Sequence, residues 1–595
     1  MEQQFSQKDY LITATLGVIL FGLYTAGACK TVYVGDSGEL TAAAATLGIP
    51  HPSGYPLYVL LGKLWITVLR FGSVAFRMSL FSVLFASLSC CFLYIVSRMA
   101  GLDRQSSLLT TTLLAVSPSF WSQANIQRVY SLNALFVVLA ILFTLKWLPN
   151  RTHRNMFFAF FICMLGACNH TSMGMIGVWL GLFVLLVEKQ SLINFRPILT
   201  IIGAGFLGLL PYLYLPLRSR MNPRLDWGDP ETFSSFLAVV TRKDYWHRSW
   251  WEHPVDFLTI GADYLLSLGQ EFFWIGLILA LLGVMFWRGQ RWLLIFLAGI
   301  AFINIITMAL HGSRADLFLW HRYYIPSYIC VALLAGFGTR YILKWLPRWS
   351  RGAVFLLPAV MLFWQWHMFD RSNFRVADDF SRQIMSTLPP GSHLIASDDN
   401  ILFSLIYLHL VEGVRPDINL VLEGVSGSGL PPLKFNPAEE PVFFTHHPNW
   451  TLPRAKIVPV GLVYRIWRTD LEPLSVSWPW TSLSGEDDPH VPKDYLTQNL
   501  IGHFHFMLGV TLEEKNWLAA EREFQLAQQK APYDDVLFYN LGLIYHRNGY
   551  LQKTRAVFVR SFQINPRKIA SKSDVRALDR IKEIDQEIKS RQLAR

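Results

Sequence analysis

The run MSLFSVLFASLSCCFLYIVS, residues Met78–Ser97, decides the fold of this chain. It contains no Lys, Arg, Asp or Glu over its whole length. A helix needs about 20 apolar residues to cross the hydrocarbon core of a bilayer, and a helix satisfies all of its own backbone hydrogen bonds there. The run therefore predicts a membrane-spanning helix.

Further apolar runs lie on both sides of this one, separated by short basic stretches. Of the whole chain 52% is hydrophobic and only 16% is charged, whereas soluble proteins are about 25% charged. We expect a polytopic α-helical membrane protein with about eleven spans, the first of them a retained helix. The predicted spans are 11–29, 78–97, 106–121, 129–145, 156–169, 172–187, 198–217, 265–287, 292–310, 323–343 and 353–369.

The charges of the connecting loops predict the orientation. With the N-terminus inside, all five inner loops carry Lys or Arg, as the positive-inside rule requires. This topology accounts for much of the net charge of +11, so we expect no nucleic-acid partner. The outer loops 30–77, 218–264 and 311–322 are basic against the rule. Binding of an anion and anchoring to lipid headgroups explain this equally well.

We divide the chain into a transmembrane domain (1–370), a soluble α/β domain (371–490) and helical repeats with a capping helix (491–595). Strands at 392–397 and 418–422 flank a helix at 401–413, which is typical of a βαβ unit, and another strand run is expected at 456–467. Residues recur 34 apart in the last part, as in tetratricopeptide repeats. The repeats leave two roles open: binding a protein partner or packing internally.

The segment YVGDSGELTAAAATLGIPHPSGYPLY, residues 33–58, follows the first span on the outer side. Asp36 and Glu39 are three residues apart and share one face of a predicted helix that ends near Leu47. Ionisable groups within a membrane are functional suspects by default, and we extend this to the membrane edge. The alternative is that Asp36 only caps the helix and Glu39 faces water.

Five motifs together resemble a known family. GDSGEL and GIPHPSGYPLY are followed by VYSLNALF at 129–136, CNHTSM at 168–173 and WGDPETF at 227–233. They resemble the transmembrane protein 260-like family of membrane O-mannosyltransferases, within the type C glycosyltransferase superfamily. In that family an acidic residue often precedes the Val-Tyr of the third motif. Here the residue is Arg128, so a catalytic role at that position is in doubt.

The resemblance implies a type C fold and a glycosyltransferase, that is, a hexosyltransferase that takes sugar from a polyprenyl-phospho-sugar lipid. The acceptor is a protein or glycan hydroxyl on the non-cytoplasmic face. Asp36 is then the catalytic base, with Glu39 next in line. We expect the donor phosphate to be bound by cations of the outer loops, and the sugar to be transferred with inversion. The predicted phosphate-binding residues are His51, Arg218, Arg220, Arg224 and Arg322, and the predicted cavity-lining residues are Asn169, His170 and Tyr55.

Weaker signals have simple structural explanations. We expect Asp229 to be a helix N-cap. The sequence Asp398-Asp399-Asn400 is more typical of a helix cap than of a metal site. No cofactor is required by the sequence, although a divalent metal is left open. The competing functions are a transporter or lipid-carrier flippase and a non-catalytic assembly scaffold. We expect the bacterial inner membrane, with the C-terminal domain periplasmic.

Overall fold

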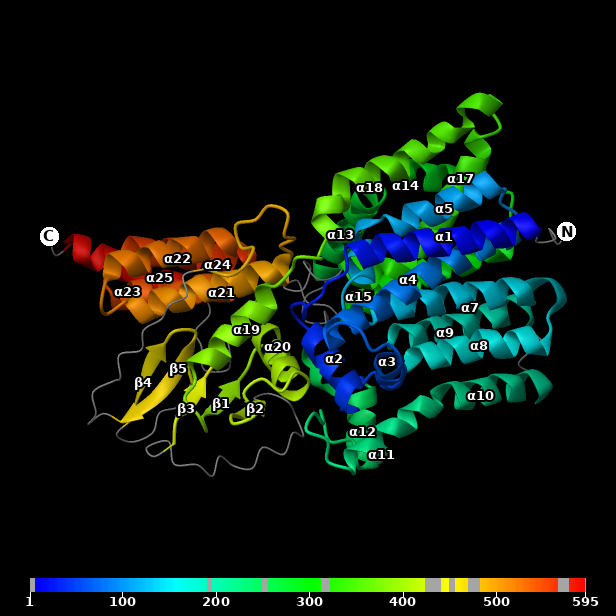
Figure 1. Ribbon diagram of the computed structural model, residues 1–595. Coiled ribbons are helices and arrows are strands. Elements are labelled where there is room, and N and C mark those ends of the chain that lie inside the picture. The colour runs from blue at the N-terminus through cyan, green and yellow to red at the C-terminus, as the bar shows by residue number, and fades with distance from the viewer. Residues whose placement is uncertain are drawn as a thin grey trace.

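The computed structural model describes residues 6–189, 195–248, 255–311, 321–422, 440–448, 455–468, 482–565 and 577–593. A bundle of long apolar helices occupies the N-terminal part of the chain, and the C-terminal part lies against one end of this bundle (Figure 1). The protein is thus an integral, multi-pass, mostly helical membrane protein with a small sheet on its C-terminal side.

Seven helices in the described residues are long and apolar enough to cross a membrane, or eight if one bent pair is a single span. The remaining predicted spans coincide with shorter helices that lie alongside the long ones in Figure 1. The spanning candidates are α1 (Gln7–Ala26), α4 (Val74–Met99), α7 (Tyr130–Asn150), α10 (Phe195–Leu209) with α11 (Tyr214–Ser219), α15 (Arg291–His311), η6 (His321–Tyr324) with α17 (Ile325–Ile342), and η7 (Arg348–Phe355) with α18 (Leu356–Phe369). The shorter helices are α5 (Arg104–Ala115), α6 (Pro118–Ala124), α8 (His153–Ala167), α9 (Ser172–Val187) and α14 (Ile275–Met285).

Two predicted spans are interrupted in the structure. The run 265–287 is not one helix, because α13 (Val255–Glu271) and α14 meet at an angle of 105°. Phe273 and Trp274 make this break with φ values of 51° and 56°. The run 106–121 is divided into α5 and α6 at Ser117, because Pro118 lacks the N–H that would continue the helix.

Small residues let α14 and α17 pack closely. A Cβ on Gly283 would collide with the carbonyl of Leu334, and a Cβ on Gly338 would collide with the carbonyl of Leu279. Such glycines are typical of helix pairs in membranes, where close van der Waals packing replaces the hydrophobic driving force. The backbones of α14 and α17 are therefore in direct van der Waals contact.

Two short helices follow the first span on the side of the soluble part. α2 (Ser37–Thr46) ends at Leu47, whose φ is 56°, and α3 (Pro56–Val68) begins after the proline-rich bend. α3 has 13 residues, which is too short to span a bilayer. α2 packs against the soluble part, since Gly38 lies directly beneath the carbonyl of Phe403.

The soluble part begins with an α/β layer. Its five strands have the order β2-β1-β3-β5-β4, with β1 parallel to β2 and β3. Strand β1, helix α20 and strand β2 form the expected βαβ unit, whereas the run 456–467 is a hairpin that turns at Gly461. The elements are α19 (Val376–Thr387), β1 (His393–Ala396), α20 (Asp399–Leu410), β2 (Asn419–Leu422), β3 (Val442–Phe444), β4 (Ala455–Val460) and β5 (Val463–Arg468).

Two helical hairpins and a final helix follow. In each hairpin a glycine on the first helix faces a phenylalanine ring on the second: Gly509 faces Phe524, and Gly542 faces Phe558. The internal repeat of the sequence thus corresponds to a repeated packing contact. The helices are α21 (Tyr495–Leu512), α22 (Trp517–Lys530), α23 (Asp535–Arg547), α24 (Leu551–Ile564) and α25 (Ala577–Leu593).

Candidate functional site

The structure brings the five sequence motifs together at the end of the membrane helices that faces the soluble part. Ile49 forms a short parallel bridge with the 225–227 segment: its N–H donates to Leu225 at 2.8 Å, and the Trp227 N–H donates to its carbonyl at 3.0 Å. The Trp227 ring lies 6.1 Å from the ring of His51. Two motifs far apart in the sequence therefore form one wall.

A cavity of about 710 Å³ lies at this junction. Its lining comes from the outer loop, from the ends of α7 and α9, from the 240–246 segment, from α15 and the start of α17, and from the soluble part. The size fits a sugar with its phosphate. The polar lining residues are Asp36, His51, Tyr55, Tyr130, His170, Thr171, Ser172, Thr241, Arg242, Tyr245, Asn304, Thr307, Arg322, Tyr323, Asp398, Asp399 and Asn400.

Asp36 faces this cavity and is paired with Arg128. The Asp36 side chain is 25% exposed, and Arg128 is almost fully buried behind it. Arg128 also donates to the carbonyl of Val34 at 2.7 Å. Although burial opposes ionisation, the charges of Arg128, Arg322 and His51 hold the pKa of Asp36 below its ordinary value. Asp36 occupies the N-cap position of α2, but its side chain makes no capping hydrogen bond in the described structure.

Two arginines, Arg242 and Arg322, also line the cavity. The guanidinium of Arg322 lies 5.4 Å from the ring centroid of Tyr130 and 5.3 Å from that of Tyr323. Arg242 lies over the ring of Tyr245 at 4.9 Å. In both arginines the Nε atom is buried without a hydrogen-bond partner among the described residues. Such donors are suited to an anion with several oxygen atoms.

Glu39 lies behind the cavity wall rather than in the cavity. It is fully buried, and its two carboxylate oxygens contact the backbone N–H of His51 at 2.8 Å and the Nδ1 atom of His51 at 2.5 Å. The Nε2 atom of His51 lies 2.9 Å from the hydroxyl of Tyr55. Glu39 is therefore not a second carboxylate facing the substrate, contrary to one expectation from the sequence.

The CNHTSM motif contributes one of its two predicted cavity residues. His170 lines the cavity and contacts the hydroxyl of Ser172 at 2.8 Å through Nδ1. Asn169 is fully buried and donates to the carbonyl of Val129 at 3.2 Å, so it supports the start of α7 instead of lining the cavity. The prediction that Asn169 lines the cavity is wrong.

Of the four arginines predicted to bind the donor phosphate, only Arg322 lines the cavity. Arg218 donates to the carbonyls of Leu47 at 2.6 Å and Thr46 at 3.2 Å, where it satisfies the last turn of α2. Arg224 contacts His409 of the soluble part at 3.2 Å, and Arg220 is exposed outside the cavity lining. The structure therefore does not support phosphate binding by Arg218, Arg220 or Arg224.

Sequence reasoning missed Arg242, Tyr323 and the pairing role of Arg128. Arg242 was one of several cations in a basic outer loop, and nothing in the local sequence distinguished it from Arg218. Arg128 was noted only as a departure from the family pattern. Nothing in the local sequence indicates that its guanidinium pairs with Asp36.

The soluble part closes the cavity with the start of α20. Asp398 caps this helix, as expected, by accepting the N–H of Asn400 at 2.9 Å. Asp399 projects into the cavity. Desolvation within the cavity and the negative charges of Asp398 and Asp36 raise the pKa of Asp399 to about 7. No group of three or more His, Cys, Asp or Glu residues that could hold a metal occurs in the described ranges.

Asp229 does not have the predicted capping role. Helix α12 (Phe233–Val240) is capped by Thr232, which accepts the N–H of Ser235 at 3.1 Å. Asp229 instead accepts the hydroxyl of Ser219 at 3.0 Å, and the same hydroxyl contacts Asp226 at 2.9 Å. Burial raises the pKa of Asp226 to about 6. This cluster holds the Trp227 turn in place.

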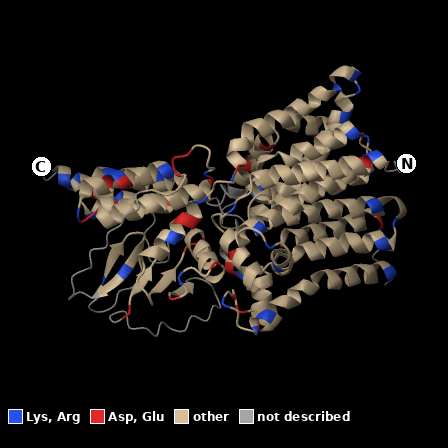
Figure 2. Ribbon diagram, viewed as in Figure 1, with Lys and Arg blue, Asp and Glu red and all other residues tan. Residues whose placement is uncertain are grey.

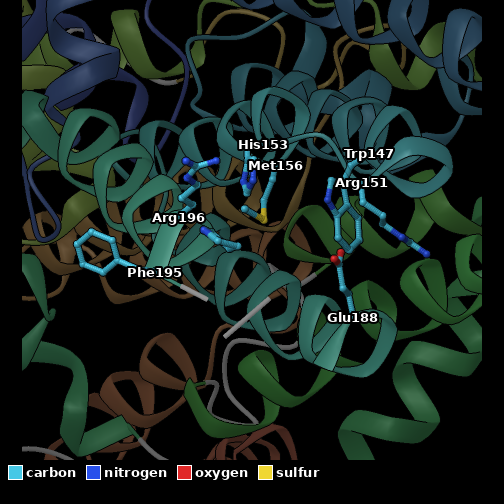
Figure 3. A pocket seen from close by; sticks show the side chains of 8 residues that line it. Trp147, Arg151, His153, Met156, Glu188, Phe195 and Arg196 are labelled. Carbon is cyan, nitrogen blue, oxygen red and sulfur yellow. The ribbon is translucent and has the colours of Figure 1, made fainter. Parts of the chain in front are cut away.

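A second cavity of about 450 Å³ lies among the end of α7, the start of α8, the end of α9 and the start of α10 (Figure 3). Arg151, His153, Glu188 and Arg196 line it, together with the ring of Trp147. The guanidinium of Arg151 stacks over Trp147 at 4.5 Å. This cavity shares no residue with the first one and contains none of the five motifs.

Comparison with known proteins confirms the resemblance for the first part of the chain. Residues 36–194 match the family model described as the N-terminal domain of protein O-mannosyl-transferase TMEM260. The chain is 30% identical over 419 residues to protein O-mannosyl-transferase TMEM260 of Mus musculus. This alignment covers 65% of this chain and 59% of the mouse protein. It is 23% identical over 457 residues to tmem260 of Dictyostelium discoideum, which covers 67% of this chain and 55% of that protein.

The chain therefore spans less than two thirds of the length of these relatives. Among solved structures, it is similar to the archaeal oligosaccharyltransferase AglB from Archaeoglobus fulgidus, with a TM-score of 0.40 and 11% identity. That similarity covers 70% of this chain and 65% of AglB.

Proposed function

Proceeding from the match of residues 36–194 to the TMEM260 family model, we propose that this protein is a membrane glycosyltransferase of the type C kind. It moves a sugar, with mannose as the first candidate, from a polyprenyl-phosphate carrier to a hydroxyl of a protein or glycan. The observation that carries this proposal is the position of Asp36, a carboxylate exposed in a cavity of about 710 Å³ at the end of the membrane helices.

The donor phosphate binds between Arg242 and Arg322. Their unsatisfied Nε donors lie in the 240–246 segment and just before α17, close to the ends of the membrane helices, where a lipid carrier can approach from the bilayer. The carrier's tail stays in the hydrocarbon region, because each buried CH₂ contributes about 0.8 kcal/mol to membrane binding. A headgroup held at this level presents its anomeric carbon to the cavity.

Asp36 accepts the proton of the acceptor hydroxyl. The hydroxyl oxygen attacks the anomeric carbon, the bond from that carbon to the phosphate oxygen breaks, and the carrier leaves as its phosphate. Arg128 keeps Asp36 ionised and oriented, so that the carboxylate is ready as a base at neutral pH. Because Glu39 is engaged by His51, it is not available as a covalent nucleophile, which supports a single displacement with inversion.

The acceptor enters from the side of the soluble part. Asp398, Asp399 and Asn400 are the residues of this part that face the cavity with polar side chains, and Leu496 of α21 closes it further. The cavity lining is thus cationic where Arg242 and Arg322 contribute and acidic where Asp398 and Asp399 contribute. A donor phosphate and an acceptor chain are directed to opposite sides by this charge difference.

The orientation in the membrane is part of the proposal. Lys and Arg gather at the helix ends far from the soluble part (Figure 2), which supports an orientation with those ends inside and the cavity on the non-cytoplasmic face. A bacterial inner membrane with a periplasmic tail stays a prediction, and the two relatives described above are from eukaryotes. A protein partner for the helical repeats likewise stays a prediction.

The test compares purified wild-type protein with Asp36→Asn, using radiolabelled polyprenyl-phospho-mannose and a hydroxyl-bearing peptide. We expect the variant to lose transfer by about 10³-fold or more while it still binds the lipid donor. Asp488→Asn is the matched control, because Asp488 is exposed and lies outside the cavity. Unchanged transfer by Asp36→Asn would remove the proposed base.

The competing functions give different results in the same preparation. A flippase or transporter would move labelled lipid or sugar across a proteoliposome membrane without forming a glycosylated product. A scaffold would bind partners but neither transfer nor move the sugar. The unsatisfied Nε donors of Arg242 and Arg322, in the same cavity as the partly exposed carboxylate of Asp36, favour transfer chemistry over both.

A further inference from the structure

We infer that Glu39, His51 and Tyr55 form a relay that presents the Tyr55 hydroxyl as a hydrogen-bond donor to the departing phosphate. In this relay Tyr55 touches the substrate, and Glu39 is a positioning residue that acts through His51. The inference rests on the proposed glycosyl transfer and assigns a role to groups behind the cavity wall.

The imidazole of His51 is held in one orientation. One carboxylate oxygen of Glu39 accepts the backbone N–H of His51 at 2.8 Å, and the other contacts the ring atom Nδ1 at 2.5 Å. Phe403 of α20 lies parallel to the ring, with 11° between the two planes, and Trp227 lies at its edge. With Nδ1 engaged by Glu39, only Nε2 can face the cavity, and it lies 2.9 Å from the Tyr55 hydroxyl.

The backbone between His51 and Tyr55 places both rings on one side. Tyr55 has a φ of 42° and a ψ of 46°, which is left-handed and uncommon for a residue with a Cβ. Such a conformation is strained and persists where the surroundings require it. It brings the two rings to 4.9 Å and points the Tyr55 ring toward His170, 6.5 Å away.

The charges around His51 favour its protonated form. Glu39 from α2, together with Asp36 and Asp399, faces it with negative charge, and Arg242 opposes them. Burial lowers the pKa of His51, but Glu39 outweighs this and the net pKa is above its ordinary value. A protonated His51 donates from both nitrogens. Its Nε2–H then points at the Tyr55 oxygen, which leaves the phenol hydrogen free to face the cavity.

This arrangement matches the charge that develops in the reaction. As the bond between the anomeric carbon and the phosphate oxygen breaks, the phosphate gains negative charge, and the acceptor proton goes to Asp36. The Tyr55 O–H donates a hydrogen bond to that phosphate, and no proton leaves Tyr55. A donor polarised by a cation behind it is stronger than an isolated phenol, and one preorganised donor contributes about 10²–10³-fold to kcat.

The first test is Tyr55→Phe in the full-length protein with radiolabelled polyprenyl-phospho-mannose. We expect kcat to fall about 10²-fold with little change in KM, because the donor hydrogen bond is made mainly to the leaving group. Tyr58→Phe is the control: Tyr58 is buried in α3 one turn away, and it does not line the cavity. Wild-type kcat in Tyr55→Phe would overturn the inference.

The second test measures the pH dependence of activity to examine the positioning role of Glu39. In Glu39→Gln we expect the alkaline loss of activity to move to lower pH, because His51 loses the carboxylate that favours its protonated form. In the Tyr55→Phe background the same change should have little further effect, whereas a purely structural role would lower activity in both backgrounds. Should Glu39→Gln fail to fold, Glu39→Asp is measured in its place. An unshifted profile in the folded variant, or full additivity, contradicts the relay.

The two proposals fail separately. Transfer by Asp36→Asn, or no transfer by the wild-type protein, contradicts the proposed function itself. A wild-type protein that transfers sugar through Asp36, with a fully active Tyr55→Phe variant, contradicts only the relay.

Discussion

The pairing of Asp36 with Arg128 sets the chemistry of the cavity at the scale of single residues. A carboxylate beside a buried guanidinium is a weaker base than a free one, yet it is ionised and fixed in position. Arg322 and His51 are also close to Asp36. Without Arg128, the position and the charge of the Asp36 carboxylate would vary with the substrate that is bound. The departure from the family pattern at position 128 therefore gains a physical role.

We predict that Arg128→Gln lowers kcat/KM at neutral pH by at least about tenfold. Asp36 loses its main positive neighbour, so its pKa rises. Because a base works only when deprotonated, the acidic loss of activity should move to higher pH. The loss of stability should be smaller than the about 3–5 kcal/mol of a fully buried pair, since Asp36 is 25% exposed. Arg224→Gln is the control, and an unshifted acidic limb would contradict the prediction.

A histidine of the helical repeats is expected to control stability in acid. Burial and the neighbouring His446, whose ring is 5.2 Å away, lower the pKa of His503 from 6.5 to about 3. The unfolded chain therefore binds a proton that the folded chain does not, and stability falls as pH decreases from about 6.5 toward 3.

We predict that His503→Phe, which places a ring beside Phe380 and Phe506, removes this dependence. At pH 5 the wild-type protein should lose up to about 2 kcal/mol that the variant keeps. Thermal unfolding of both proteins between pH 7 and pH 5 measures the difference. His505 is a contrast, because Glu486 and Glu523 outweigh burial and raise its pKa to about 9, so its contribution is lost at high pH. Parallel Tm curves for wild type and His503→Phe would refute the prediction.

At the scale of elements, the contact between α2 and α20 joins the loop that carries Asp36 to the soluble part. The N-terminal turn of α2 lies against the backbone of α20, with Gly38 opposite the carbonyl of Phe403. The N-terminal ends of the same two helices carry Asp36 and Asp399, which both line the cavity. The distance between these helices thus sets the width of the cavity.

We predict that Gly38→Ala pushes the two helices apart and lowers both activity and stability. A methyl group at this position meets a backbone carbonyl, which cannot rotate away as a side chain would. Overpacking of this kind costs about 1–3 kcal/mol, and we expect a lower Tm together with a raised KM for the acceptor. Gly22→Ala is the control because a Cβ there meets no atom within 4 Å. Equal behaviour of the two variants would show that the contact is not tight.

At the scale of the whole molecule, charge is distributed along the axis of the membrane helices. Lys and Arg cluster at the ends remote from the soluble part (Figure 2), and the cavity lies at the other end. All six cysteines are unpaired and buried, so we expect the wild-type chain to react little with a thiol-directed label. Two exposed positions, Lys515 and Arg288, lie at the two ends of the molecule.

We predict that Lys515→Cys and Arg288→Cys react with an impermeant maleimide from opposite sides of sealed membrane vesicles. Lys515 follows α21 in the soluble part, whereas Arg288 lies in the turn between α14 and α15. In vesicles with the cytoplasmic face outward, only Arg288→Cys should be labelled before detergent is added. Labelling of both variants from one side would contradict the topology and place the cavity on the wrong face.

Much of the architecture could be predicted from the sequence because the controlling forces are local. A bilayer requires each span to satisfy its own hydrogen bonds, so apolar runs such as 78–97 identify spans directly. The βαβ unit follows from local alternation and turns. Asp36, His51, Tyr55 and His170 could be selected because their motifs are contiguous in the chain. The break at Phe272–Trp274 was missed because it depends on neighbouring helices.

What only the tertiary structure decided is which charged groups share the cavity. Arg218 and Arg242 are equivalent in the sequence, yet one satisfies the carbonyls at the end of α2 and the other lines the cavity. Glu39 lies behind His51, and Asp399 arrives from a separate layer of the fold. These outcomes depend on the directions in which packed helices present their side chains, and such directions are fixed by contacts between distant segments rather than by any local pattern.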